Sequence, residues 1–168
     1  MGVSYFMLPK IVVQNDKASK EAILERPLDG NPDFSKNEDD NKYPTLKEIY
    51  ESIEKAQIKI EYEDRSLDEF KLKNGKREIV HSMGITDNEM NYSFDFTMRY
   101  PEAADENHRI TTLMGIKSRP RILIKLFSAI SKKCGSYFIC NPYESYFIDK
   151  EKSFEEIWHR IQTNWNNE

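Results

Sequence analysis

Two carboxylates, Glu61 and Glu63, have the spacing that an acid/base pair on a strand could have. They alternate with Ile60 and Tyr62, so an extended backbone would project both carboxylates from one face. A glycosidase-type pair needs a fixed separation and environments that split the two pKa values. Neither property follows from this spacing. We interpret the pair as the water-facing side of a half-buried strand.

Other catalytic patterns are missing from the sequence. It has no Gly-x-Ser-x-Gly motif, and its six glycines form no phosphate-binding loop. Of the three histidines, His159 is expected on the polar side of a helix, His81 at the end of a hairpin strand and His108 in a loop. Cys134 and Cys140 fit neither a disulfide framework nor a zinc spacing, so we predict two buried free thiols. We therefore predict no metal or cofactor site and no enzyme, although a site assembled from dispersed residues remains an alternative.

Basic residues are concentrated in one segment. Between Arg109 and Gly135 the chain has seven basic residues and no acidic one: Arg109, Lys117, Arg119, Arg121, Lys125, Lys132 and Lys133. A helix over 119–133 could present these residues to nucleic acid. The alternative is a solvated helix face complemented by acidic neighbours in the fold. The net charge of −4 weighs against nucleic acid and anionic membranes as partners.

Acidic residues dominate the first part of the chain, with fifteen acids against nine bases from Asp16 to Asp68. Acidic surfaces steer basic protein partners into contact. Two groups stand out, one in the Asn/Asp-rich segment 25–41 and one at 61–64. The candidate partner-binding residues are Asp33, Glu38, Asp39, Asp40, Glu61 and Glu63.

The elements that would position these groups centre on residues 118–149. Apolar residues recur at helical spacing after Pro120, and Gly135 marks the helix end. Two short apolar runs around the turn at 141–144 predict a hairpin. Capping-box patterns at Thr45–Glu48 and Ser153–Glu156 predict two more helices.

The remaining elements are mainly strands. We expect residues 3–13 to form one edge strand broken at Pro9, or two short strands, and residues 58–63 to form a further strand. Asn74-Gly75 predicts a two-residue hairpin turn that places Phe70 opposite Ile79. Alternation over 92–100 predicts a further strand. The sequence thus predicts one α+β domain over 1–168, a mainly antiparallel sheet with about three helices packed on one face, and a flexible acidic loop at 25–44.

Part of the C-terminal third resembles a known class of proteins. Gly135-Ser136-Tyr137-Phe138-Ile139-Cys140-Asn141, Tyr146-Phe147-Ile148-Asp149 and the Phe154…Trp158 helix resemble endings of some small bacterial immunity proteins. Those proteins are cytoplasmic inhibitors of toxins that neighbouring cells deliver. The resemblance covers about a fifth of the chain and carries over no functional residue. It implies a cytoplasmic protein that binds a cognate toxin domain one to one, often over the toxin's active site.

Overall fold

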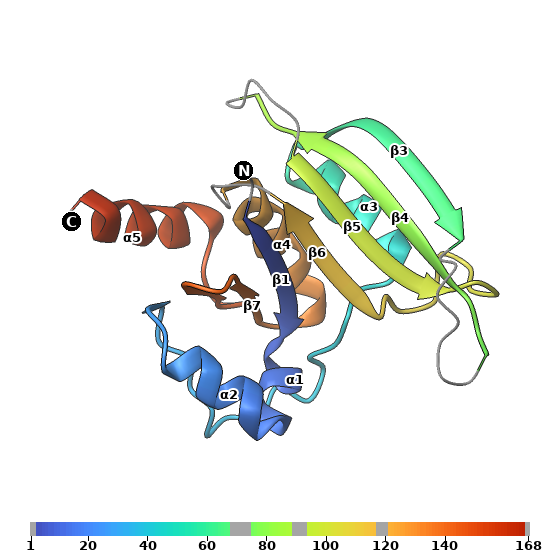
Figure 1. Ribbon diagram of the computed structural model, residues 1–168. Coiled ribbons are helices and arrows are strands. Elements are labelled where there is room, and N and C mark those ends of the chain that lie inside the picture. The colour runs from blue at the N-terminus through green and yellow to red at the C-terminus, as the bar shows by residue number, and fades with distance from the viewer. Residues whose placement is uncertain (1–2, 68–74, 89–93, 117–120, 167–168) are drawn as a thin grey trace.

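The computed structural model describes residues 3–67, 75–88, 94–116 and 121–166, which form an α+β fold around one eight-stranded sheet (Figure 1). The strand order is β2-β8-β7-β1-β6-β5-β4-β3. Neighbouring strands are antiparallel except for the short β2–β8 pair. The strands are β1 (Ser4–Pro9), β2 (Leu28–Asp29), β3 (Lys59–Leu67), β4 (Glu78–Thr86), β5 (Phe94–Pro101), β6 (Thr112–Ile116), β7 (Tyr137–Cys140) and β8 (Ser145–Ile148).

Five helices lie among the described residues, where about three were predicted. They are α1 (Lys10–Asn15), α2 (Lys17–Leu24), α3 (Leu46–Lys55), α4 (Arg121–Cys134) and α5 (Phe154–Asn166). The three predicted helices are α3, α4 and α5. Both predicted capping boxes are present, because Thr45 exchanges hydrogen bonds with Glu48 and Ser153 does so with Glu156.

The main core lies between one face of the sheet and α3, α4 and α5. It joins Ile49 of α3, Phe127 of α4 and Ile157 of α5 to inward side chains of the strands, such as Phe96 and Met98. In Figure 1, α3 and α4 lie behind the sheet, and the front of β6, β5 and β4 is left uncovered by the described helices. One face of the central strands is therefore packed and the other is open.

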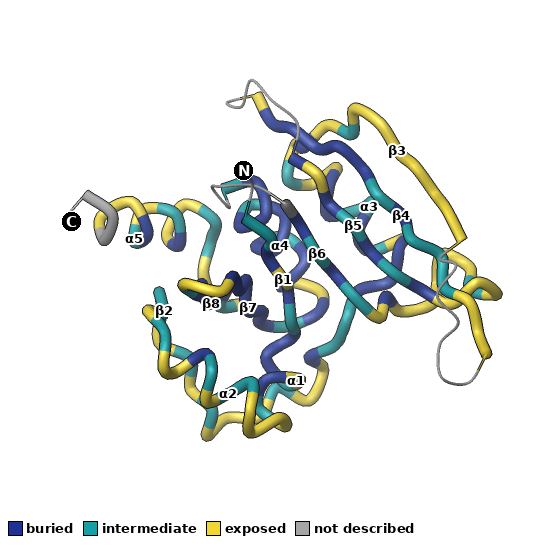
Figure 2. Tube along the Cα trace, viewed as in Figure 1, coloured by how far each residue is buried: buried dark blue, intermediate teal, exposed yellow. Residues whose placement is uncertain are grey.

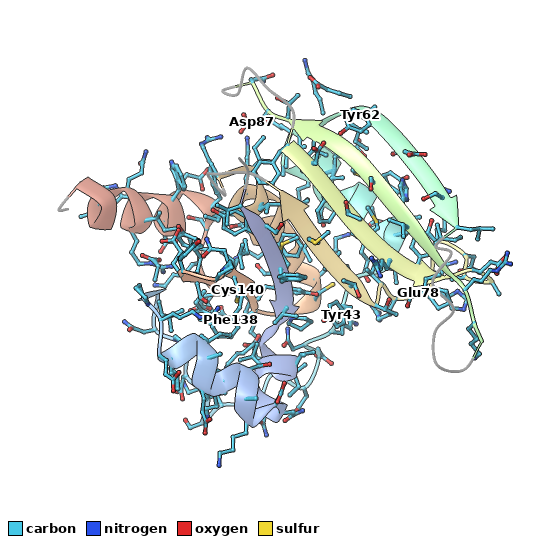
Figure 3. All side chains as sticks on the ribbon, in the orientation of Figure 1. Tyr43, Tyr62, Glu78, Asp87, Phe138 and Cys140 are labelled. Carbon is cyan, nitrogen blue, oxygen red and sulfur yellow. The ribbon has the colours of Figure 1, made fainter. Side chains whose placement is uncertain are left out.

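The other face of β7 and β8 carries a second, smaller core. Successive strand residues point to opposite faces, so Phe138, Cys140 and Phe147 face away from the main core. Val13 of α1 and Ile23 of α2 pack against them; Phe138 and Cys140 are labelled in Figure 3. The helices therefore cover both faces at this end of the sheet, not one face as predicted.

Two local predictions are corrected. β1 is not an edge strand, because it lies between β7 and β6. The chain after Pro9 turns into α1 and does not continue as a strand, and Lys10 N–H donates to the Ser136 carbonyl at that junction. Ile79 pairs with Leu67, whereas the two-residue turn predicted Phe70 as its partner. The predicted partner lies in 68–74, outside the described residues. The left-handed Gly75 (φ +77°) agrees with a turn at that position.

The acidic segment 25–44 has anchors in the structure. The Asn41 amide donates to the carbonyls of Cys134 and Ser136 and accepts from Ile11 N–H. Glu38 accepts from Ser136 N–H. The flexibility of this segment stays a prediction, and these contacts identify the residues that would restrain it. No helix among the described residues is long and apolar enough to span a membrane.

Candidate protein-binding surface

Strand β3 is the outer edge of the sheet and its most exposed strand. The strand order ends at β3, so its outer backbone faces no neighbouring strand among the described residues. Eight of its nine residues are exposed, with Ile60 the exception. Figure 2 shows β3 exposed along its length beside the largely buried and half-buried β4 and β5. The sheet therefore presents a long, accessible strand on one side only.

A bulge at Glu61 decides which way the β3 side chains point. Ile60 pairs with Ile85 and Tyr62 pairs with Gly84, so Glu61 is the extra residue. Beyond the bulge the register runs unbroken from Tyr62 to Leu67. The predicted alternation, with Tyr62 on the same side as Ile60, is therefore wrong. Tyr62 lies on the open face, and Glu63 lies on the face of the helices, opposite the buried Met83.

Tyr62 is fixed on the open face by its two neighbours. Its ring covers Gly84, where an added Cβ would lie 2.2 Å from the ring. Its hydroxyl donates to a carboxylate oxygen of Asp95 on β5, beyond the intervening strand β4. That hydrogen bond raises the pKa of the Tyr62 phenol. The ring (labelled in Figure 3) is still 49% exposed, so it presents a held aromatic surface.

Four polar side chains meet on the other face, between β3 and α3. The Tyr50 hydroxyl donates to Glu63 Oε2 over 3.2 Å and accepts from Arg65 over 3.0 Å. Glu63 Oε2 lies 3.5 Å from Nε2 of His81, which is fully buried between the rings of Tyr50 and Tyr100. Within the described part of the chain, neither ring nitrogen of His81 has a hydrogen-bond partner. Of the surface and cross-strand roles that the end of a hairpin strand predicts for His81, the surface role is wrong, and His81 lies between Arg65 and Met98 of the neighbouring strands.

Burial lowers the pKa of His81, and the nearby Arg65 guanidinium lowers it further. The Glu63 carboxylate acts in the opposite direction. The imidazole is thus held neutral under a carboxylate that is partly open to solvent.

The structure separates the two predicted acidic groups. Glu61 and Glu63 lie on β3, whereas the segment with Asp33, Glu38, Asp39 and Asp40 contacts α1 and the α4–β7 junction, several strands away. Glu38 is only 12% exposed and pairs with Lys10 and Lys150. Asp33 accepts hydrogen bonds from Ser35. Asp39 and Asp40 are exposed.

The described cations of the basic segment are bound within the chain. Arg121 and Lys125 pair with the buried Asp87 (labelled in Figure 3), and Arg121 also stacks over the Phe154 and Trp158 rings. Lys132 donates to two backbone carbonyls. Lys133 pairs with Glu51 and Arg109 with Glu48. Lys117 and Arg119 lie outside the described residues. This arrangement matches the alternative of a helix face complemented by acidic neighbours.

Groups that could do chemistry are dispersed. No cluster of three or more His, Cys, Asp or Glu residues suited to a metal ion occurs within 3–67, 75–88, 94–116 and 121–166. Cys134 and Cys140 are free and buried, as predicted, and burial raises the pKa of the Cys134 thiol to about 12. Three surface cavities of about 300, 400 and 310 Å³ are lined mainly by charged and polar side chains, and none of the three includes His81 or a cysteine.

No family model matches the chain, and no curated protein or solved structure is significantly similar to it.

The sequence indicated two members of this surface and missed the others. Glu61 and Glu63 were predicted as contact residues from charge clustering, whereas Tyr62 and Asp64 belong to the same indicated stretch, 61–64, but were not among the candidate contact residues. Tyr62 has no local signal that separates a buried from an exposed ring, because its orientation depends on the bulge at Glu61. The one available signal was Gly84 inside an otherwise apolar strand, since an isolated strand glycine often marks a close approach.

Proposed function

We propose that this protein is a non-catalytic binding protein that occludes a cognate protein partner, as immunity-type inhibitors do, and that β3 is its contact surface. The observation that carries the proposal is the exposed edge strand, backed by a rigid sheet and by α3. A surface built on regular elements keeps its shape when a partner binds, which lowers the entropic cost of association.

Charge and aromatic content support this surface. Three carboxylates (Glu61, Glu63 and Asp64) outnumber its two cations (Lys59 and Arg65), and Arg65 donates to the Tyr50 hydroxyl. An acidic surface accelerates encounters with a basic partner and disfavours acidic ones. Tyr62 adds a half-exposed ring whose position is already fixed, and tyrosine is enriched among the residues that dominate binding energy.

The inhibitor role is the specific form of binding that the sequence resemblance implies. It would require a one-to-one complex in which this chain blocks its partner's active site. The acidic groups found here would suit a partner whose active-site surface is basic.

The test uses a photo-crosslinking residue in place of Ser66, an exposed β3 residue on the open face. Lysate of the source organism is irradiated, and the beads are washed at about 0.5 M salt, which screens attraction between exposed charges. The captured protein is then purified and its activity is assayed with increasing amounts of the unlabelled chain.

We expect one captured protein whose activity falls to its minimum at one equivalent of this chain. Two double variants, each reversing two acidic charges, test whether inhibition depends on the β3 surface. Glu61→Lys with Asp64→Lys should abolish inhibition, whereas Glu25→Lys with Glu151→Lys, two exposed acids elsewhere, should leave it unchanged. A captured protein whose activity does not respond to this chain would contradict the proposal.

A further inference from the structure

We propose that the β3 edge binds an extended, basic segment of its partner as an added strand, through backbone hydrogen bonds along Tyr62–Leu67. This inference rests on the proposed function, because it states how the same surface holds the partner. The relationship on which it depends is an unbroken, exposed edge whose free backbone is bordered by carboxylates.

The backbone of Tyr62–Leu67 is suited to strand addition. Edge strands are commonly protected by lysines, prolines or bulges that stop another strand from pairing. In β3 the lysine (Lys59) and the bulge (Glu61) both precede the six residues of the edge, which contain no lysine and no proline. Their two charges on the face of the helices, Glu63 and Arg65, are hydrogen-bonded to Tyr50. Their unbroken pairing with β4 holds the outer N–H and C=O groups in a regular strand geometry. A partner strand would satisfy those groups and gain most of its affinity from the backbone.

The side chains select the charge of the added strand. Glu63 borders the edge on the face of the helices, and Asp64 borders it on the open face. Opposite charges on directly paired residues stabilise a sheet, and like charges destabilise it. Lysine or arginine side chains on both faces of the added strand would therefore find a carboxylate. Leu67, 48% exposed, offers an apolar contact at the far end.

A fully buried histidine, His81, lies beside Glu63. Neither nitrogen of the ring has a hydrogen-bond partner among the described residues, and Nε2 lies 3.5 Å from Glu63 Oε2. Buried polar groups are rarely left unpartnered in a finished structure. A cation bound at Glu63 would weaken the pull of the carboxylate on the His81 proton, so His81 would report on binding at this edge.

A second copy of this chain fits the edge poorly. An antiparallel pairing of β3 with itself centred on Tyr62 places Glu61 opposite Glu63. Centring it on Glu63 or on Asp64 places that residue opposite its own copy. Each of these arrangements sets carboxylate against carboxylate, and centring on Arg65 sets guanidinium against guanidinium. The occupant is therefore a different chain of basic character.

The test uses synthetic peptides of about eight residues, a usual strand length, in which Lys or Arg alternates with Thr or Val. A second peptide has the same sequence with alternate backbone amides N-methylated, and a third has Glu at every basic position. Each is titrated into the ¹⁵N-labelled full chain at about 0.15 M salt, where screening leaves direct contacts as the main source of affinity. Amide shifts and the His81 ring resonances are followed by NMR.

We expect the basic peptide to shift the amides of Tyr62–Leu67 and to lower the pKa of His81. The N-methylated peptide should bind at least about tenfold more weakly, and the acidic peptide should not bind. In the Glu63→Gln/Asp64→Asn variant the basic peptide should also weaken, whereas Glu25→Gln/Glu151→Gln should not change it.

Equal binding of the basic and N-methylated peptides would overturn strand addition, and so would the absence of any binding. The photo-crosslinking experiment separates this failure from failure of the proposed function. A partner that crosslinks at Ser66 and is inhibited, while peptides fail, leaves the function intact and removes only the added strand. If no partner crosslinks and is inhibited, and the peptides also fail to bind, both the proposed function and the added strand are contradicted.

Discussion

The hydroxyl of Tyr62 donates to the carboxylate of Asp95 across the intervening strand β4. The contact is possible because Gly84 lies between them and has no side chain. One hydrogen bond and one glycine thus fix the orientation of the most prominent aromatic ring on the binding edge.

Gly84→Ala tests this arrangement. A Cβ at position 84 would fall 2.2 Å from the Tyr62 ring, so the ring must leave and its bond to Asp95 must break. Because the ring is half-exposed and free to swing outward, we expect a cost of only about 1 kcal/mol in the free energy of unfolding, measured by urea denaturation. Partner affinity should fall about tenfold, as expected when an anchoring aromatic is misplaced.

Asp95→Asn is the matched control for the glycine change. This substitution leaves room for the Tyr62 ring but replaces the carboxylate that accepts the hydrogen bond of the Tyr62 hydroxyl with a neutral amide. The pKa of the Tyr62 phenol should then fall toward its ordinary value, which NMR titration would show. If Gly84→Ala left partner affinity unchanged, Tyr62 would have no part in binding.

His81 should make stability depend on pH. Its pKa in the folded protein is lowered from 6.5 by burial, so below pH 6.5 the unfolded chain binds a proton that the folded chain resists. The contribution of neutral His81 to the free energy of unfolding is fully present above pH 6.5, and it is lost as the pH falls toward the lowered pKa of His81 in the folded protein. His81→Phe should flatten the fall in unfolding free energy over this window.

The exposed His159 provides the comparison for this measurement. In His159→Gln the dependence of unfolding free energy on pH should match that of the parent chain. A His81→Phe chain that loses stability on acidification as steeply as the parent would show that another group is responsible.

Among the charged residues near α4, we expect substitution of Asp87 to lower the free energy of unfolding the most. Its buried carboxylate pairs with Arg121 and Lys125, which are 14% and 21% exposed. Asp87→Ala leaves two cations without this partner in a poorly solvated site, so we expect a loss of about 3 kcal/mol in unfolding free energy. Asp39→Ala, at an exposed position, should change it by less than about 0.5 kcal/mol. A similar effect of the two substitutions would contradict the assigned roles.

Asn41 should control the motion of the acidic segment 25–44. Asn41→Ala removes three hydrogen bonds to the backbone of Ile11, Cys134 and Ser136. Backbone groups left unsatisfied cost about 1–3 kcal/mol each, although water can replace part of this loss near the surface. We expect amide hydrogen exchange in residues 36–44 to accelerate, while exchange in β4 and β5 stays slow. Uniform acceleration throughout the sheet would show that Asn41 supports the whole fold.

Local signals in the sequence predicted much of the fold. The capping boxes at Thr45 and Ser153 and the helical spacing after Pro120 each describe interactions within a few residues. These elements were therefore predicted correctly, as was the β7–β8 hairpin. The α+β class followed from the order of such elements.

Features that depend on distant residues could not be predicted. Residues 10–13 have the β-branched composition of a strand, yet they form α1, which packs on the small core beside Phe138. The bulge at Glu61 reverses the side-chain alternation and depends on pairing with β4. The burial of His81 requires Tyr50 of α3 and Tyr100 of β5, which no local spacing connects.

The candidate site shows the same division. Charge clustering identified Glu61 and Glu63, but only the sheet order shows that they lie on an edge strand far from Asp39 and Asp40. Sequence reasoning combined two groups that the fold keeps apart.

The most direct test of the central claim is the affinity of the captured partner for variants in which two acidic residues are replaced by lysine. Glu61→Lys/Asp64→Lys on β3 and Asp39→Lys/Asp40→Lys in the acidic segment change the net charge equally, and Glu25→Lys/Glu151→Lys is the control. If β3 is the binding surface, the first pair should weaken binding by about tenfold or more, well beyond the effect of the net charge change seen in the control. A loss confined to the Asp39/Asp40 pair, or an equal loss in all three, would show that the partner does not bind at the β3 edge.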